Sequence, residues 1–187
     1  NKAGAIQLRG QGYQLDKNYL AAITAYREMV ETLRSISPES TDVATALNAL
    51  AGAEHANKDY PAAERHYREA LRIAKKVSFQ EGVAENTSGL AELALDREQW
   101  AEAEGLAREA LALSEKVGRQ ELIAGVCHVL AKALVRARHA SPLQEAPLQE
   151  ALSLSRRAVE IFTRLRHKDL QEAQETLAEI EKMMNSE

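Results

Sequence analysis

Apolar residues recur every three or four positions along almost the whole 187-residue chain, with polar residues between them. This spacing is typical of helices with one buried face, and no stretch alternates residue by residue as a half-buried strand does. The pattern predicts four helix pairs and one last helix. Their expected ranges are 3–15 and 18–35, 42–57 and 60–77, 82–97 and 100–117, 120–138 and 146–166, and 169–184.

Turn-forming residues lie where the pattern predicts that helices end. Within the first three pairs the turns are Asp16-Lys17-Asn18, Asn57-Lys58-Asp59 and Asp96-Arg97-Glu98. Pro61 follows the second of these turns, at a position where the first turn of a helix tolerates a missing amide hydrogen. Between pairs, Ser37-Pro38 and Val117-Gly118 are expected to stop one helix before the next begins.

Three columns of small residues repeat about every 40 positions. The columns are Gly10, Ala51, Ala91 and Ala131; Ala22, Ala63, Ala103 and Ala151; and Met29, Ala70, Ala110 and Ala158. A fixed period of this size indicates stacked repeats, each packed on its neighbours. We therefore expect one all-α repeat domain over 1–187, with repeats at about 3–36, 42–77, 82–117 and 120–166 and a capping helix at 169–184.

The turn inside the fourth pair is enlarged. The first and second columns are 12 residues apart in three pairs, but 20 apart between Ala131 and Ala151. Five of the extra residues are a copy, because Pro142–Ala146 and Pro147–Ala151 have the same sequence. We expect an exposed tip there, either a tolerated duplication or a loop that contacts a partner.

The columns and their aromatic neighbours resemble the tetratricopeptide repeat. The residues that carry the resemblance are Leu47, Leu50-Ala51, Tyr60, Ala63, Tyr67 and Ala70-Leu71 in the second repeat, and Leu90-Ala91, Trp100, Ala103 and Ala110-Leu111 in the third. The fourth repeat departs from the pattern, with Ser155 where an aromatic is usual. The period of about 40 resembles the arrays of kinesin light chains and the C-terminal arrays of bacterial signalling NTPases.

This resemblance implies a right-handed superhelical solenoid that acts as a protein-protein interaction module. It also implies that the first helix of each pair lines a concave groove, which binds a peptide or protein segment. The polar residues expected in that groove are Gln7, Gln11, Gln14, Asn48, His55, Ser88, Glu92, His128, Lys132 and Arg136. Four of these share one column, which would bind the backbone of an extended peptide: Gln7, Asn48, Ser88 and His128.

Charge is unevenly distributed along the chain, whose formal net charge is −4. Residues 132–168 are rich in lysine and arginine, whereas the last predicted helix is acidic. Two interpretations stay open. The basic stretch is either a pocket for an acidic peptide or phosphate, or a basic end that the adjacent acidic helix neutralises.

Enzymatic chemistry finds little support in the sequence. Glycine-rich phosphate loops and the common hydrolase motifs are missing, and the five histidines lack the spacing of metal ligands. We expect no catalytic residues, cofactor, metal, nucleic acid or membrane span. The single cysteine, Cys127, falls at a core position and suits a reducing, cytoplasmic compartment. The first residue is Asn1, so we expect an excised fragment; the alternative function is a regulatory sensor domain from a larger signalling NTPase.

Overall fold

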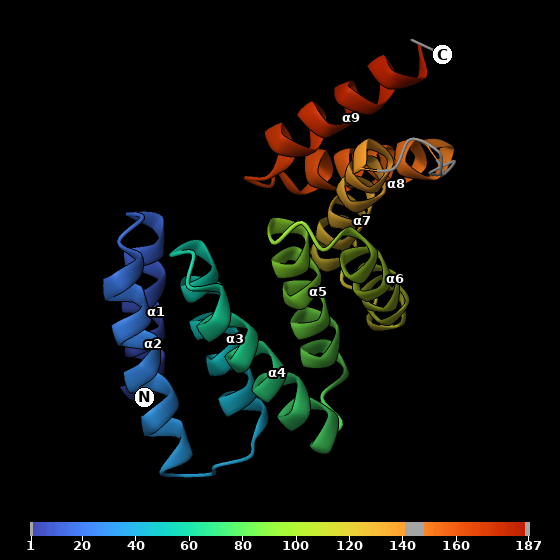
Figure 1. The fold of residues 1–187 in the computed structure, drawn as a ribbon. Helices are drawn as coiled ribbons and strands as arrows, with labels where there is room; N and C mark the ends of the chain where they lie inside the picture. Colours follow the sequence, from blue (N-terminus) through green and yellow to red (C-terminus); the bar gives the residue numbers. More distant parts are fainter. Residues whose placement is uncertain (1, 141–147, 186–187) are drawn as a thin grey trace. The chain divides into compact units, whose positions relative to one another are not determined.

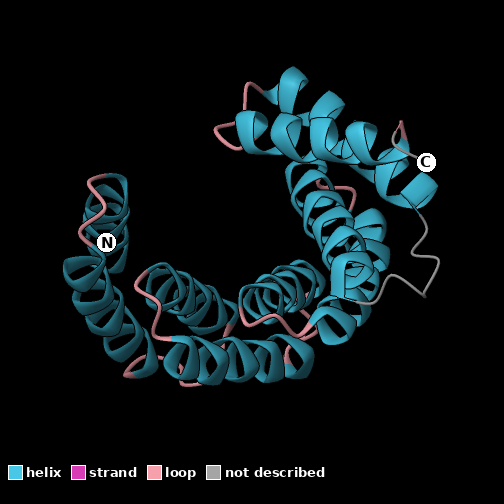
Figure 2. Cartoon of the chain, turned by 45° about the horizontal axis from the view of Figure 1, so that its top comes forward, coloured by secondary structure: helices cyan, strands magenta, loops and turns pink. Residues whose placement is uncertain are grey.

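The computed structural model describes residues 2–140 and 148–185, and these contain helices and short loops without a strand (Figures 1 and 2). The helices are α1 (Lys2–Leu15), α2 (Tyr19–Arg34), α3 (Thr41–Ala56), α4 (Tyr60–Lys76), α5 (Gln80–Asp96), α6 (Trp100–Val117), α7 (Gln120–Ala140), α8 (Leu148–Leu165) and α9 (Leu170–Met184). The predicted all-α repeat solenoid is confirmed, with helix ends within two residues of the expected ranges. No helix in the described ranges is long and apolar enough to cross a membrane.

Small residues of the three predicted columns lie in the core. Gly10 is buried, and the alanines of the columns are 0% exposed. Because an alanine projects only one methyl group, helices that meet at these positions approach closely. Each of the packed helix sets therefore has an apolar interior although the chain contains few aromatic residues.

The chain divides into two compact units, Asn1–Leu93 and Ala94–Glu187, with the boundary inside α5. In the first unit α1 packs on α2, α2 on α3, and α3 on α4. In the second unit α6 packs on α7, α7 on α8, and α8 on α9, while α9 also contacts α7 (Figure 1). Each unit thus repeats one arrangement, in which a helix contacts the helices that precede and follow it.

Turns inside the first three pairs share one backbone geometry. Lys17, Lys58 and Glu98 have left-handed φ angles of 56°, 63° and 60°. The amide after each donates to a carbonyl five residues back, as from Asn18 to Tyr13 at 2.8 Å. This six-to-one bond satisfies a carbonyl that the end of the helix leaves unpaired. The same motif therefore sets the turn in each of these pairs.

Aromatic rings of the second helices pack on glycines of the first helices. Tyr26 of α2 is 1% exposed and lies against Gly10 of α1, where an added Cβ would come within 2.5 Å of the ring. Its hydroxyl donates to Oε1 of Gln14 at 2.7 Å. Tyr67 of α4 lies in the same way against Gly89 of α5. Because Gly10 and Gly89 have no side chain, they leave space for the rings of Tyr26 and Tyr67, which the other repeats lack.

The duplicated segment falls mainly outside the described residues. Its first copy, Pro142–Ala146, and Pro147 are not described, so the predicted exposed tip stays a prediction. The rest of the second copy opens α8, where Leu148 and Ala151 are buried. Glu150 of this copy accepts two hydrogen bonds from Arg108 of α6, at 2.6 and 2.8 Å.

Deleting five residues, Pro142–Ala146, is expected to leave the thermal midpoint and helical content nearly unchanged. Removal of either copy gives the same sequence, so α8 keeps Leu148–Ala151 and their contacts. Ala131 and Ala151 would still be 15 residues apart, more than the 12 of the other pairs. A shorter loop also changes the closure entropy only slightly. Circular dichroism on heating tests this, and a midpoint lower by several degrees would show that the segment packs.

Candidate partner-binding surfaces

Polar side chains of α1 and α3 form the better exposed part of the predicted groove. Gln11 is exposed, whereas Gln7, Gln14, Asn48 and His55 are half-buried. On α5, Glu92 is half-buried, but Ser88 is only 6% exposed. Ser88 therefore presents little surface to a ligand, and the expected row of hydrogen-bonding residues is accessible mainly on the first two pairs.

Hydrogen bonds inside the first unit hold several of these side chains in place. Asn48 donates to Oδ1 of Asn86 on α5 at 3.1 Å, and Asn86 in turn donates to the carbonyl of Gly82 at 2.6 Å. This chain of bonds fixes one N–H of the Asn48 amide and joins α3 to α5. The Gln14 carbonyl oxygen is likewise occupied by the Tyr26 hydroxyl. The amides of Asn48 and Gln14 are therefore held in fixed orientations.

Acidic side chains lie on the accessible parts of α3 and α5. Neither helix contains lysine or arginine. Between Glu81 and Leu93, the side chains of α5 that reach solvent are Glu81, Glu85 and Glu92. On α3, Asp42 is exposed in the first turn. The accessible charged side chains of these two helices that the structure describes are therefore carboxylates.

A hollow of about 160 Å³ lies where α1, α2 and α3 meet. Its lining residues are Ala3, Gly4, Gln7, Met29, Leu33, Asp42 and Thr45. Met29 and Leu33 supply an apolar wall from α2, while Gln7, Asp42 and Thr45 supply polar atoms from α1 and α3. The hollow thus adjoins the predicted groove, with Gln7 belonging to both.

In the second unit, the basic residues predicted to line the groove are paired with α9. Nζ of Lys132 lies 2.7 Å from Oε1 of Glu172, and Nη1 of Arg136 lies 3.0 Å from Oε1 of Glu179. Of the two interpretations of the basic stretch, the structure therefore supports neutralisation by the acidic last helix. An acidic partner at α7 would compete with carboxylates of the same chain.

His128, the third predicted residue on α7, is 7% exposed. Its Nε2 lies 3.5 Å from Oε1 of Glu172, too far for a good hydrogen bond, and neither ring nitrogen has a hydrogen-bond partner among the described residues. Burial, followed by the charge of Lys132, lowers the pKa of His128, so the ring is neutral at neutral pH. It cannot serve as a cationic anchor there.

Acid is expected to weaken the attachment of α9. The hydrogen bond from Lys132 is the main cause of a lowered pKa at Glu172, so its stabilising effect is present at neutral pH and is lost as the carboxylate protonates. The lowered pKa of His128 acts in the same direction, because the unfolded chain binds a proton there more readily than the folded chain does.

Reversing the charges of Lys132 and Arg136 to glutamate is expected to destabilise the second unit by about 1 kcal/mol, because each new carboxylate would face a carboxylate of α9. Limited proteolysis should then cut α9 faster than in the wild type. Exchanging the partners as well, with Glu172→Lys and Glu179→Arg, should restore resistance. Equal cleavage of all three proteins would show that these ion pairs do not hold α9.

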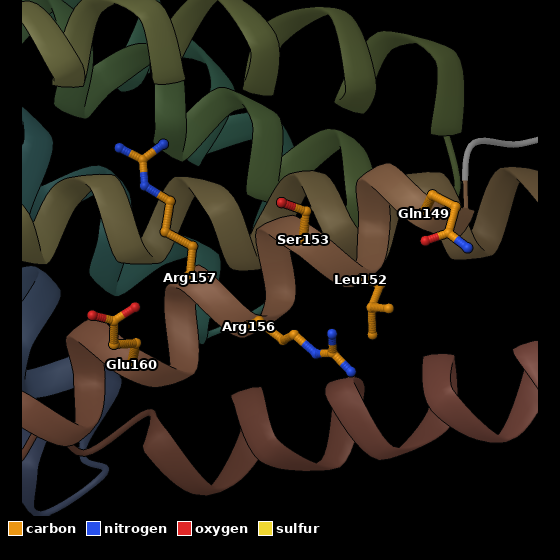
Figure 3. Close-up of a pocket in the computed structure, with 6 residues that line it drawn as sticks. All are labelled: Gln149, Leu152, Ser153, Arg156, Arg157 and Glu160. Atoms are coloured by element: carbon orange, nitrogen blue, oxygen red, sulfur yellow. The ribbon is translucent and has the colours of Figure 1, made fainter.

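A second hollow, of about 330 Å³, lies beside α8 (Figure 3). Its lining residues are Gln149, Leu152, Ser153, Arg156, Arg157 and Glu160. Figure 3 shows Arg156 pointing toward the neighbouring helix α9, where Nη2 lies 3.1 Å from Oε1 of Glu181. Arg157 points the other way and pairs with Glu115 of α6 at 2.6 Å. Both guanidinium groups already have carboxylate partners, so the hollow offers no free anion site.

A buried polar cluster in the first unit was not predicted. Glu54 of α3 is 0% exposed and accepts hydrogen bonds from Nη2 of Arg27 at 3.3 Å; its other oxygen lies 2.6 Å from Nδ1 of His66. The 12-residue step from Glu54 to His66 matches the step between the small columns, and this signal could have paired them. The cluster joins α2, α3 and α4 and is structural.

Catalytic chemistry gains no support from the described residues. Cys127 is 0% exposed, and burial raises the pKa of its thiol to about 11, so the reactive thiolate is scarce at neutral pH. Within residues 2–140 and 148–185, histidine, cysteine and carboxylate side chains form no group of three that could hold a metal ion.

Comparisons with known proteins agree with this architecture. Two family models described as tetratricopeptide repeat match residues 3–76 and 87–117, which together make up more than half of the chain. No curated protein matches the sequence.

Several solved structures are similar in fold. RapI in its apo form has a TM-score of 0.71 and 18% identity, over 97% of this chain but only 48% of its own length. BtubC (BKLC) from P. vanneervenii has a TM-score of 0.73 and 20% identity, over 96% of this chain and 72% of that one. A kinesin light chain-like protein from Podosopora anserina, with nearly identical TPR-like repeats, has a TM-score of 0.71 and 20% identity, over 99% and 88% of the two chains.

Proposed function

We propose that this chain, which belongs to the tetratricopeptide repeat family, is a protein-interaction module whose first unit binds an extended or helical segment of a partner protein. The observation that carries the proposal is the row of accessible amides on α1 and α3, which includes Gln7, Gln11 and Asn48. Amide side chains both donate and accept hydrogen bonds, so they can pair with the backbone of a segment whatever its sequence.

The fixed orientation of the Asn48 side chain supports this proposal. The Asn48 amide is held by Asn86, which leaves its carbonyl oxygen and one N–H for a ligand. Side chains that are already ordered lose little conformational entropy when a partner binds. Helices that carry them are fixed by the buried small-residue columns, so the spacing between the amides is also set before binding.

The second unit contributes less to the proposed surface. Lys132 and Arg136 are engaged by α9, and His128 is buried and neutral at neutral pH. An acidic segment would have to displace Glu172 and Glu179 to reach these cations. A preference for acidic partners at α7 therefore stays a prediction that depends on the release of α9.

The double variant Gln7→Ala with Gln11→Ala is expected to weaken partner binding by about 1–3 kcal/mol in total, because two neutral hydrogen bonds are lost. Salt should change this loss little, because neither group is charged. Proximity labelling identifies the partner, and titration calorimetry with the purified partner measures the loss. Gln174→Ala, on the exposed side of α9, is the matched control. Unchanged affinity in the double variant would move the binding surface away from α1 and α3.

Asn48→Ala is a poorer test of the same surface. It would leave Oδ1 of Asn86, a residue that is 1% exposed, without its donor. An unsatisfied buried acceptor costs about 1–3 kcal/mol of stability. Weaker binding by that variant would therefore mix the loss of a ligand contact with damage to the fold.

A further inference from the structure

The hollow between α1, α2 and α3 has the lining of a pocket for a single side chain. Its volume of about 160 Å³ is below the roughly 300–1,000 Å³ of typical cofactor and ligand sites. Met29 and Leu33 line it with apolar groups. Asp42 and Thr45 of α3 and Gln7 of α1 line it with polar groups.

Asp42 is the charged group of this lining. It is exposed, and α3 and α5 supply no lysine or arginine to neutralise it. Lys2, the nearest cation along α1, lies 3.8 Å from Glu28 of α2. Arg9 pairs with that same glutamate. The cations described on the first helix are thus directed to Glu28, and Arg34 of α2 is paired with Glu69 at 2.6 Å, so none of these neutralises Asp42.

We infer that this hollow binds one lysine or arginine side chain of the partner segment, with its aliphatic stem against Met29 and Leu33 and its cationic group at Asp42. Long basic side chains bury their methylene groups on apolar surface while the charged end stays near water, and the lining matches that division. This inference rests on the proposed function, because the segment must lie along α1 and α3.

The basic side chain inferred for this hollow is opposite in charge to the acidic partner that the sequence predicts for α7. There the cations are already paired within the chain, whereas here a carboxylate stands beside an apolar wall without a cation from α3. Asp42 also lies in the first turn of α3, where a negative charge stabilises the helix end. The test must therefore separate binding from folding.

Three short peptides with blocked ends, identical except for a central lysine, norleucine or glutamate, provide the probe. Titrated into isotope-labelled protein, the lysine peptide is expected to shift the amide signals of Gln7, Asp42 and Thr45 and to bind more tightly than the norleucine peptide. Asp42→Asn should lower its affinity about two- to fivefold at low salt, and less at high salt. Asp16→Asn, which removes an exposed carboxylate outside the hollow, should change nothing.

Gln7→Lys is a second variant that does not depend on the stability of α3. The new ammonium group would occupy the hollow and abolish the preference for lysine over norleucine. Equal binding of the three peptides, or an unchanged preference in both Asp42→Asn and Gln7→Lys, would overturn the inference while leaving the proposed function intact. If no peptide shifts the signals of α1 and α3, the inference also fails, and calorimetry with the natural partner then decides the proposed function separately.

Discussion

Removing both side chains that face Glu54, in the double variant Arg27→Ala with His66→Ala, is expected to lower the free energy of unfolding by about 3–5 kcal/mol. Glu54 is 0% exposed, and the only side chains shown to pair with its two oxygens in the described part of the chain are those of Arg27 and His66. Without them, a charge stays buried without compensation. Chemical denaturation monitored by circular dichroism measures the change.

Glu54→Leu, added to the same double variant, is expected to restore most of the lost stability. Leucine fills a similar volume and needs no partner, and replacing a buried ion pair by apolar groups is often neutral or stabilising. If the double variant is as stable as the wild type at neutral pH, water must solvate Glu54 and the cluster is not dry.

Alanine at Gly10 is expected to destabilise the first unit by about 1–3 kcal/mol, whereas alanine at Gly12 should stabilise it by about 0.5–1 kcal/mol. Both glycines lie in α1, so the gain in helix propensity is the same. They differ in surroundings, because a Cβ at Gly10 would come within 2.5 Å of Tyr26 Cε1, and one at Gly12 would meet nothing within 4 Å. Opposite shifts in the denaturation midpoint are the expected signature.

Tyr26 has little freedom to yield to that methyl group. Its ring is 1% exposed, and its hydroxyl is held by Gln14 across the pair. Gly10→Ala combined with Tyr26→Leu should therefore recover part of the loss, since the smaller side chain leaves room for the Cβ. A Gly10→Ala variant at least as stable as the wild type would mean that α1 and α2 move apart easily.

Most of the helical pattern could be predicted because it is set locally. Alanine columns and turn residues fix each pair within about 40 residues, so the expected ends of α3 and α6 differ from the observed ones by at most one residue. Turn geometry is equally local, since Lys17, Lys58 and Glu98 each occupy the same place in their repeat. The family resemblance added handedness and a class of function to this framework.

Exposure of the groove residues could not be predicted in the same way. Ser88 and His128 occupy the same position in their repeats as Asn48. Packing against neighbouring helices, however, determines how much solvent reaches each of the three side chains. Both are more than nine-tenths buried, whereas Asn48 is half-exposed. Pairing of charges across neighbouring helices is similarly a property of packing, so the sequence left the two interpretations of Lys132 open.

Ion pairs between neighbouring helices join residues that are close in the sequence, so the ribosome adds both partners within a short time. Arg9 and Glu28 are 19 positions apart, and Arg136 and Glu179 are 43 apart. A ribosome that adds about 5–20 residues per second completes a 40-residue repeat in about 2–8 s, whereas helical domains with such local contacts fold in microseconds to milliseconds. We therefore expect each pair to pack on the preceding pair soon after it emerges, and the N-terminal pairs to be folded while α9 is still being synthesised.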